Sequence, residues 1–472
     1  MYSNTPTKVR KTVLAALACL AALSAYGDDD MAGLRTAGTG QTYNFAKLST
    51  MEGSGVRWID GQPGYYAVER NDTIDASDIF EIDEGVTVKF ADKISFVIEG
   101  TAALKAPFDN PTTFTRLNDS DTPYCIRIED HYGVIMSNLN FEYLGVEVSK
   151  EDALMLNNCS FKYHNGSTAA ALYFVKAGGS CTINDCHFEE CQKAAIGSAA
   201  NAQQDFDIHG STFIRNSTLN RNIPQINVTA ANIGIADCTI IGDSTSLTSN
   251  NMVGGIGVSN FMGYEDTKLG VYRCTISHNR YGIGTVGPVS DVQIWDNVIT
   301  DNNHEAKPMN GGSGISFYDP YRQTCAVVAG NRIAGNCWGV TIIGCKDVNL
   351  GQPASSVQSS PGGNVFADNG NDGVPYDLYN NSDLTVYAQN NTWGVDEQTE
   401  EKIETVIFHK NDDEKLGQVI FMPAAGGSAG INNIENEGRS ANDRAYSLSG
   451  IRLHNSDSSR ISIENGKKVL RK

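Results

Sequence analysis

The residues best suited to chemistry lie between positions 278 and 322, in three short groups. They supply two imidazoles, two carboxylates, two guanidinium groups, one amine and three phenol rings: His278, Arg280 and Tyr281; His304, Glu305 and Lys307; Tyr318, Asp319, Tyr321 and Arg322. A phenol ring can stack on a sugar face, a guanidinium can pair with a carboxylate, and an imidazole can take a proton near neutral pH. The combination indicates a sugar chain as ligand, if the fold brings the three groups together.

Three of these residues are the candidates for catalysis. If the chain cleaved a uronate by β-elimination, Arg280 would neutralise the substrate carboxylate and His278 would abstract the ring proton. Glu305 would assist or hold Ca²⁺, the one possible cofactor. The other seven residues are predicted to bind the substrate: Tyr281, His304, Lys307, Tyr318, Asp319, Tyr321 and Arg322.

The candidate residues belong to a repeat that runs from about residue 134 to residue 394. A Cys, Ser or Asn followed two residues later by an aromatic or Ile recurs nine times, at spacings of 23 to 36 residues, starting at Cys159, Cys186, Ser211, Cys238, Cys274, Asn297, Asn331, Asn364 and Asn391. Apolar residues alternate within runs of only three to five residues, which indicates strands and not helices. A second phrase, Gly followed by Ile or Val, recurs as well. Each repeat therefore predicts one coil of about three short strands.

Stacked coils of this kind predict an all-β fold, a right-handed parallel β-helix solenoid with a small C-terminal β unit. The Phe or Ile of each repeat is expected to stack inside. A second Asn recurs five residues after the first position of the phrase, at Asn216, Asn279, Asn302, Asn336 and Asn369. We expect these residues at left-handed turns, with amides that bond from coil to coil.

The repeat phrases resemble those of secreted bacterial β-helix proteins of the pectate-lyase-like kind, over roughly residues 74 to 394. This resemblance implies action on, or binding to, carbohydrate. The signature motifs of pectate lyases and polygalacturonases are absent, so no catalytic residue carries over. Residues 446–452 and 461–472 look like the C-terminal sorting domain of type IX secretion cargo, which implies secretion machinery as a partner; a simple terminal hairpin is the alternative.

The N-terminus has the pattern of an export signal. Three basic residues precede an apolar run over 12–25, which predicts a protein that is secreted or held on the outer cell surface; a lipid anchor at Cys19 is the alternative. The formal charge of −19 argues against nucleic acid. A monomer is expected, with this organisation: signal peptide 1–27, N-terminal segment and cap 28–73, β-helix 74–394, C-terminal cap 395–423, linker 424–442 and sorting-like hairpin 443–472.

The cysteine column allows two states. Cys159, Cys186, Cys238 and Cys274 are expected to point inward, where reduced thiols would behave as small apolar groups. Disulfides between the first two and between the last two are the alternative. Cys181, Cys186 and Cys191 beside His187 fit no standard zinc spacing.

Loop lengths predict where a site would form. Three or four residues separate the recurrent turn residue from the Gly-Ile phrase in three coils, whereas twelve separate them in two others. The two long loops, 244–254 and 303–313, should leave the same corner and enclose a cleft above the short turn that carries Arg280 and Tyr281. We expect both side chains to be exposed on that turn.

Two functions remain open at this stage. The favoured one is a non-catalytic glycan-binding or adhesin-like scaffold that recognises a polysaccharide or cell-surface glycan. The alternative is a polysaccharide lyase or glycoside hydrolase that acts in the cleft between the two long loops. Whether the chain is an enzyme is not decided by the sequence.

Overall fold

The computed structural model describes residues 31–129, 133–149, 153–176, 178–245, 251–264, 267–305, 311–352 and 358–425, together with three short strands nearer the C-terminus. The predicted signal peptide, the Cys19 anchor, nearly all of the linker and Lys307 lie outside the described residues. So do the central parts of both long loops, 246–250 and 306–310. Among the described residues, no helix has the length and apolar character needed to span a membrane.

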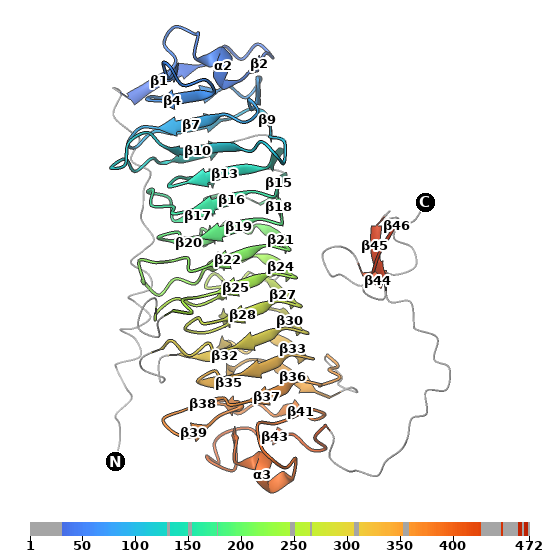
Figure 1. The fold of residues 1–472 in the computed structure, drawn as a ribbon. Coiled ribbons are helices and arrows are strands. Elements are labelled where there is room, and N and C mark those ends of the chain that lie inside the picture. The colour runs from blue at the N-terminus through green and yellow to red at the C-terminus, as the bar shows by residue number, and fades with distance from the viewer. Residues whose placement is uncertain are drawn as a thin grey trace, which may run out of the picture.

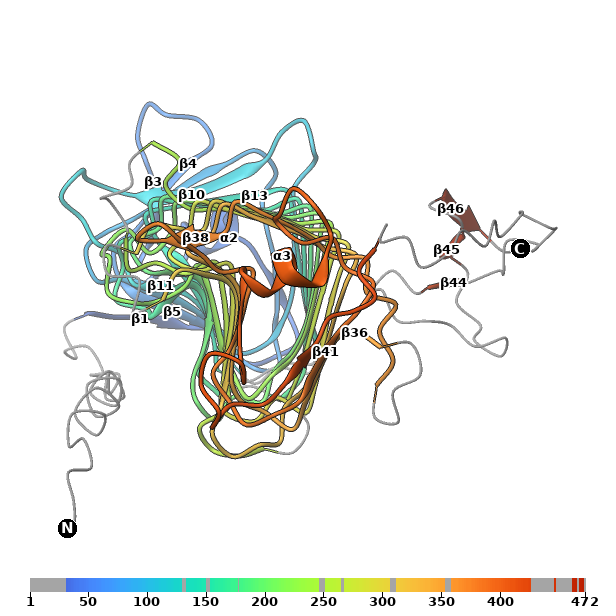
Figure 2. The ribbon, with the colours of Figure 1, turned by 90° about the horizontal axis from the view of Figure 1, so that it is seen from below.

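Three long sheets form the sides of a solenoid, as the repeat predicts (Figures 1 and 2). Sheet A contains β1 (Ala32–Arg35), β5 (Asn71–Ile74), β8 (Ser95–Ile98), β11 (Cys125–Ile128), β14 (Gly145–Val148), β17 (Ala170–Phe174), β20 (Ala194–Ser198), β23 (Ile226–Thr229), β26 (Ile256–Ser259), β29 (Ile283–Val286), β32 (Ser313–Asp319), β35 (Trp338–Gly344), β40 (Leu378–Asn380) and β42 (Ile407–Phe408). Sheet B contains β2 (Thr42–Tyr43), β6 (Ile79–Glu81), β9 (Thr101–Lys105), β12 (Val134–Ser137), β15 (Ala153–Asn157), β18 (Ser180–Asn184), β21 (Asp205–His209), β24 (Asn232–Ala236), β27 (Lys268–Tyr272), β30 (Asp291–Trp295), β33 (Cys325–Ala329), β36 (Asp347–Gly351), β41 (Val386–Ala388) and β43 (Val419–Ile420). Sheet C contains β3 (Val56–Trp58), β4 (Tyr65–Val68), β7 (Thr87–Phe90), β10 (Thr112–Arg116), β13 (Leu139–Glu142), β16 (Ser160–Lys162), β19 (His187–Glu189), β22 (Thr212–Ile214), β25 (Thr239–Ile241), β28 (Thr275–Ser277), β31 (Val298–Thr300), β34 (Arg332–Ala334) and β37 (Val365–Ala367).

The chain visits the sheets in the order B, C, A in each coil, and neighbouring coils pair in parallel. The fold is a right-handed parallel β-helix. Its first coil begins at Ala32 and not near residue 74, because β1 and β2 already pair in parallel with β5 and β6. Three short strands near the C-terminus form a separate antiparallel sheet: β44 (Ala445–Tyr446), β45 (Ile461–Glu464) and β46 (Lys467–Leu470).

A column of polar side chains closes the corner between sheets B and C. The backbone N–H of Asn297 donates to Asn331 Oδ1 of the next coil at 2.9 Å, and Asn331 donates to Asn364 Oδ1 at 3.1 Å. The cysteines of this column take the same role, since Cys159 N–H donates to Cys186 Sγ at 3.4 Å. All ten described cysteines are free thiols. These thiols are therefore weak polar links and not only apolar filling.

The second asparagine column forms a similar ladder at the corner between sheets C and A. Asn279 N–H donates to Asn302 Oδ1 at 3.2 Å, and Asn302 N–H donates to Asn336 Oδ1 at 3.0 Å. The expectation that these asparagines have left-handed geometry is wrong. The residue before each asparagine has the positive φ, for example His278 at 58° and Asp301 at 56°. The asparagines follow that turn with buried side chains.

The core is a stack of apolar side chains that continues from coil to coil. Five phenylalanine rings of sheet C lie at centroid separations of 4.6 to 5.2 Å and nearly parallel: Phe114, Phe141, Phe161, Phe188 and Phe213. Phe213 is fully buried and is followed by Ile240 in the next coil.

Both ends of the stack are covered. Helix α2 (Phe45–Leu48) places Phe45 against Phe80 and Phe96. At the other end, α3 (Glu400–Glu404) buries Ile403. A short hairpin, β38 (Gly370–Asn371) with β39 (Val374–Pro375), lies between sheets C and A.

Replacing Phe213 by Ala is expected to lower the free energy of unfolding by about 3 to 5 kcal/mol, because stacked coils cannot close the cavity. Phe108→Ala is the matched control, since the Phe108 side chain is 78% exposed. Chemical denaturation of both variants measures the difference. An unchanged Phe213→Ala midpoint would contradict the inward stack.

Candidate functional site

The two long loops of the sequence analysis both connect sheet C to sheet A, at one corner. One joins β25 to β26 and the other joins β31 to β32, and the short turn 278–282 between β28 and β29 lies between them. A third long connection, 215–225, enters the same corner between β22 and β23. Loop counting missed it because Gln225 and Ile226 stand where other coils have Gly-Ile.

Arg280 is the centre of this corner and not an exposed residue. Its Nε donates to Glu305 Oε2 at 2.5 Å, and its Nη1 donates to Asn222 Oδ1 of the third connection. The Arg280 and Glu305 side chains are only 10% and 9% exposed. The fold thus brings two predicted catalytic residues together, but as a buried ion pair that ties the connections to one another. The Nε and Nη1 groups of Arg280 are thus already bonded to protein acceptors.

Two imidazoles lie beside each other at the same corner. The ring centroids of His278 and His304 are 6.1 Å apart, and His304 is 2% exposed with no hydrogen-bond partner at Nδ1 among the described residues. Burial, followed by the nearby His278, lowers the pKa of His304, while Asp243 opposes the shift. His304 is therefore neutral at neutral pH.

Tyr281 lies on the outer face of sheet A. A Cβ on Gly254 would come within 2.2 Å of the Tyr281 ring, and one on Gly284 within 2.9 Å, so glycine at both positions makes room for the phenol. Loss of water around the hydroxyl raises the pKa of Tyr281 to about 12. The ring rests on the sheet and does not project from an exposed turn.

The last group of predicted residues lies along the opposite edge of sheet A, where the chain passes to sheet B. It consists of Tyr318, Asp319, Tyr321 and Arg322. They are therefore at the other side of sheet A from the long loops. Tyr318 and Tyr321 are 37% and 67% exposed. Arg322 pairs with Asp383 at 2.8 Å on the surface.

Asp319 has a structural role at this edge. It is fully buried, and its carboxylate accepts the backbone N–H groups of Tyr321, Gln323 and Thr324 at 2.7 to 2.9 Å. Asp319 thus fixes the loop that presents Tyr321, and its oxygens are already bonded to that loop.

A surface depression of about 280 Å³ lies at the same edge. It is lined by Asn260, Phe261, Met262, Gly263, Pro288, Tyr321 and Gln323. Phe261 and Met262 are 64% and 63% exposed. Asn260 holds the depression in shape, because its Nδ2 donates to the carbonyls of Tyr264 and Pro288 at 2.7 Å. Of its lining residues the sequence analysis named only Tyr321, since the others belong to no repeat phrase.

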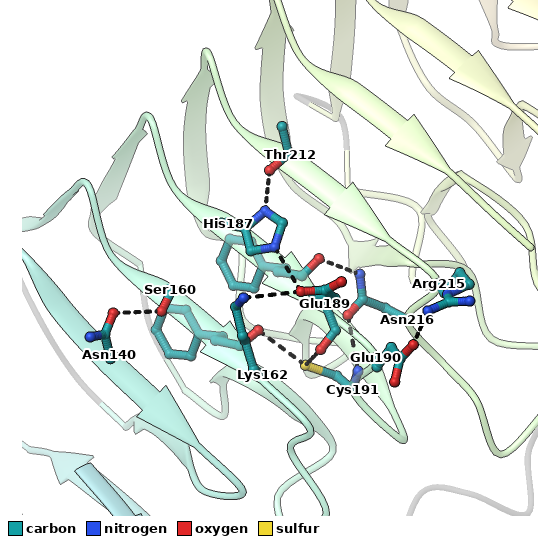
Figure 3. Close-up of polar contacts among 12 residues, drawn as sticks. Asn140, Ser160, Lys162, His187, Glu189, Glu190, Cys191, Thr212, Arg215 and Asn216 are labelled. Carbon is teal, nitrogen blue, oxygen red and sulfur yellow. Dashed lines mark hydrogen bonds and ion pairs between the residues drawn. The ribbon is translucent and has the colours of Figure 1, made fainter. Parts of the chain in front are cut away.

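The cysteines and the histidine near residue 187 point to opposite sides of sheet C. His187 points outward from sheet C, where Nδ1 meets Thr212 at 2.5 Å and Nε2 meets Glu189 at 3.1 Å (Figure 3). Cys191 points inward, and its Sγ lies 3.7 Å from the Phe161 carbonyl oxygen. No group of three or more metal-ligand side chains gathers anywhere in the described ranges.

Comparisons with known proteins give a distant structural likeness. No family model matches the sequence, and no curated protein matches it. Among solved structures, the periplasmic alginate epimerase AlgG is 12% identical, with 80% of this chain and 76% of that chain covered and a TM-score of 0.33. A single-substitution variant of that epimerase is 11% identical, with 81% of this chain and 83% of that chain covered and a TM-score of 0.35. Another single-substitution variant is 12% identical, with 81% of each chain covered and a TM-score of 0.32. Likeness this distant assigns no activity.

Arg280→Ala is expected to lower the free energy of unfolding by about 3 to 5 kcal/mol, because it removes the guanidinium that pairs with the buried Glu305 carboxylate. Adding Glu305→Gln should restore part of the loss, since the buried carboxylate charge is then removed. Arg322→Ala, which breaks the exposed pair with Asp383, should stay within about 0.5 kcal/mol of the parent. Equal denaturation midpoints for Arg280→Ala and Arg322→Ala would show that the corner is solvated.

Proposed function

We propose that this chain is an exported glycan-binding protein and that the sugar chain lies along the outer face of sheet A. The single observation that carries the proposal is the row of exposed aromatic and apolar side chains beside the depression at the sheet A to sheet B edge. Phe261, Met262 and Tyr321 are each more than 60% exposed and rimmed by polar residues. Contiguous apolar surface with a polar rim is typical of a binding site.

The shape of the outer face of sheet A supports this proposal. Its central outward position is occupied by small residues in four successive strands. Gly257 and Gly284 make room for Pro224 and Tyr281, whereas Ser316 and Thr341 in the next two strands are partly exposed. The long sheet C to sheet A connections flank this row on one side, and Tyr318 and Tyr321 flank it on the other. Parallel strands repeat every 4.8 Å or so, close to the length of one pyranose ring. A sugar chain that runs along the solenoid axis would therefore meet the Tyr281 ring and then the small residues of β32 and β35.

The charge of the protein restricts the ligand. The formal charge of −19 disfavours direct binding of an acidic polymer, so a neutral glycan fits best, or an acidic one bridged by Ca²⁺. The arginine closest to the loops, Arg280, is held by Glu305. Export and delivery to the cell surface through the C-terminal unit rest on the sequence features at the two ends of the chain.

Changing Tyr318 and Tyr321 together to Ala should weaken glycan binding about fivefold or more, because each stacked ring contributes about 0.5 to 1.5 kcal/mol. Isothermal titration with soluble neutral polysaccharides measures the change. Tyr163→Ala is the matched control, since Tyr163 is 39% exposed on another side of the solenoid. A double variant that binds as tightly as the parent would contradict binding at this face.

A second candidate function, acid–base cleavage of a glycan, is favoured by one observation. His304 is buried, neutral and without a partner at Nδ1 beside His278 at the loop corner. An enzyme would release reducing ends or unsaturated uronates from a bound polysaccharide, and His278→Ala would stop the release with binding retained. Binding without product formation supports the scaffold.

A further inference from the structure

A second set of aromatic and polar side chains lies on the outer face of sheet B, away from the surface proposed above. Four neighbouring strands contribute two parallel rows. The first row contains Asp207, Gly234, Gly270 and Gln293, and the second contains His209, Ala236, Tyr272 and Trp295. All eight occupy outward positions, because the residues between them in the strands are buried.

Two aromatic rings from adjacent strands are fixed in place on this face. A Cβ on Gly270 would come within 2.6 Å of the Tyr272 ring, so the phenol folds over a position that only glycine leaves open. Trp295 Nε1 donates to Gln293 Oε1 at 2.9 Å, and Gln293 Nε2 donates to Asp291 Oδ1 at 2.7 Å. Gln358 from the connection after β36 also donates to Asp291, at 3.0 Å. Both rings are partly exposed and preoriented, although neither contributes to the core.

A carboxylate without a protein donor lies on the same face. Asp207 is partly buried, and no residue in the described part of the chain donates a hydrogen bond to it or pairs with it. Burial raises its pKa, and the nearby His209 only partly opposes the shift. The next carboxylate along the sheet, Asp237, by contrast accepts hydrogen bonds from Arg273 Nε and Nη2, each at 2.8 Å. Asp207 is thus free to accept the vicinal hydroxyls of a sugar ring, the donors that an aromatic-stacked pyranose presents at its edge.

We propose that Asp207, His209, Tyr272, Gln293 and Trp295 form a second glycan-binding surface, which we name the sheet B platform. Its ligand is a neutral pyranose chain. Three strand spacings separate Asp207 from Gln293, about 14 Å, which accommodates a short run of rings.

The charge around the platform supports a neutral occupant. Four carboxylates border it, at Asp205, Asp237, Asp291 and Asp296, whereas the basic residues at its border are Lys268 and Arg273. Arg273 is neutralised by Asp237. An acidic polymer would be repelled, and hydroxyl donors match the carboxylate acceptors.

The test uses the full mature chain carrying Tyr318→Ala and Tyr321→Ala, so that binding at sheet A does not mask the platform. Its mobility is measured in native gels that contain xyloglucan, galactomannan, laminarin or polygalacturonate. We expect at least one neutral polysaccharide to retard it, with the apparent affinity falling tenfold or more when Trp295→Ala is added. Asp207→Asn should weaken binding at least threefold with the shape of the face retained. Met155→Ala is the control, since Met155 is 40% exposed on the same face of sheet B in β15.

Three results would overturn the platform: no retardation by any neutral polysaccharide, retardation by polygalacturonate alone, or retardation that survives both Trp295→Ala and Asp207→Asn. Thermal melting shows whether each variant is folded. If Trp295→Ala does not fold, Asp207→Asn alone tests the platform. The experiment can contradict either of the two proposed binding surfaces without contradicting the other. If the parent and the sheet A double variant bind equally, sheet A binding is wrong and the platform stands. If Trp295→Ala changes nothing but the sheet A substitutions abolish binding, the reverse holds.

Discussion

The hydrogen bond from a turn N–H to the inward polar side chain of the next coil is the interaction on which this structure depends. Most of the sharp corners in the described coils contain a residue with positive φ, and the N–H that follows it points along the solenoid axis with no strand to receive it. A buried N–H without an acceptor is costly, so the corner requires an inward acceptor one coil further on. Asparagine serves best because its amide also donates: Asn331 Nδ2 donates to the Ile294 and Ala329 carbonyls at 2.9 and 3.1 Å. Cysteine makes weaker hydrogen bonds at the same position. Cys186 Sγ accepts from the Cys159 backbone N–H and donates to the Asn184 carbonyl at 3.3 Å.

Fixed corners let the connections vary without disturbing the sheets. The sheet C to sheet A connection is a short turn after β28 but a long loop after β22, β25 and β31, and the register of sheet A continues through all of these coils. The long loops are joined to one another by the buried Arg280–Glu305 pair and by Asn222. The outer faces of the sheets are then available for side chains that the core does not need, such as Tyr321 beside sheet A and Trp295 on sheet B.

The repeat predicted much of the fold, because its physical cause is repeated in every coil. Period-two alternation requires strands, equal phase requires stacking, and the recurrent Asn and Cys positions require two inward columns. The positive φ belongs to His278 and Asp301 and not to the asparagines that follow them. The sequence could not show this, because asparagine is tolerated at both positions of the corner. The candidate site was predicted less well. The burial of Arg280 depends on a connection without a repeat phrase, and Asp319 bonds to backbone that only the folded loop supplies. Trp295 gave no signal, since an outward aromatic residue in one strand looks the same whether or not Tyr272 lies beside it.

Residue-resolved amide hydrogen exchange tests most directly whether the corner N–H groups are hydrogen-bonded to the next coil, because it reports on individual N–H groups. The account predicts that the amides of Asn279, Asn297, Asn302 and Asn331 exchange as slowly as those of buried strand residues such as Ile276 and Ile299, even though they lie at turns. Exchange of these asparagine amides at the rate of exposed loop amides, with the strands still protected, would contradict it.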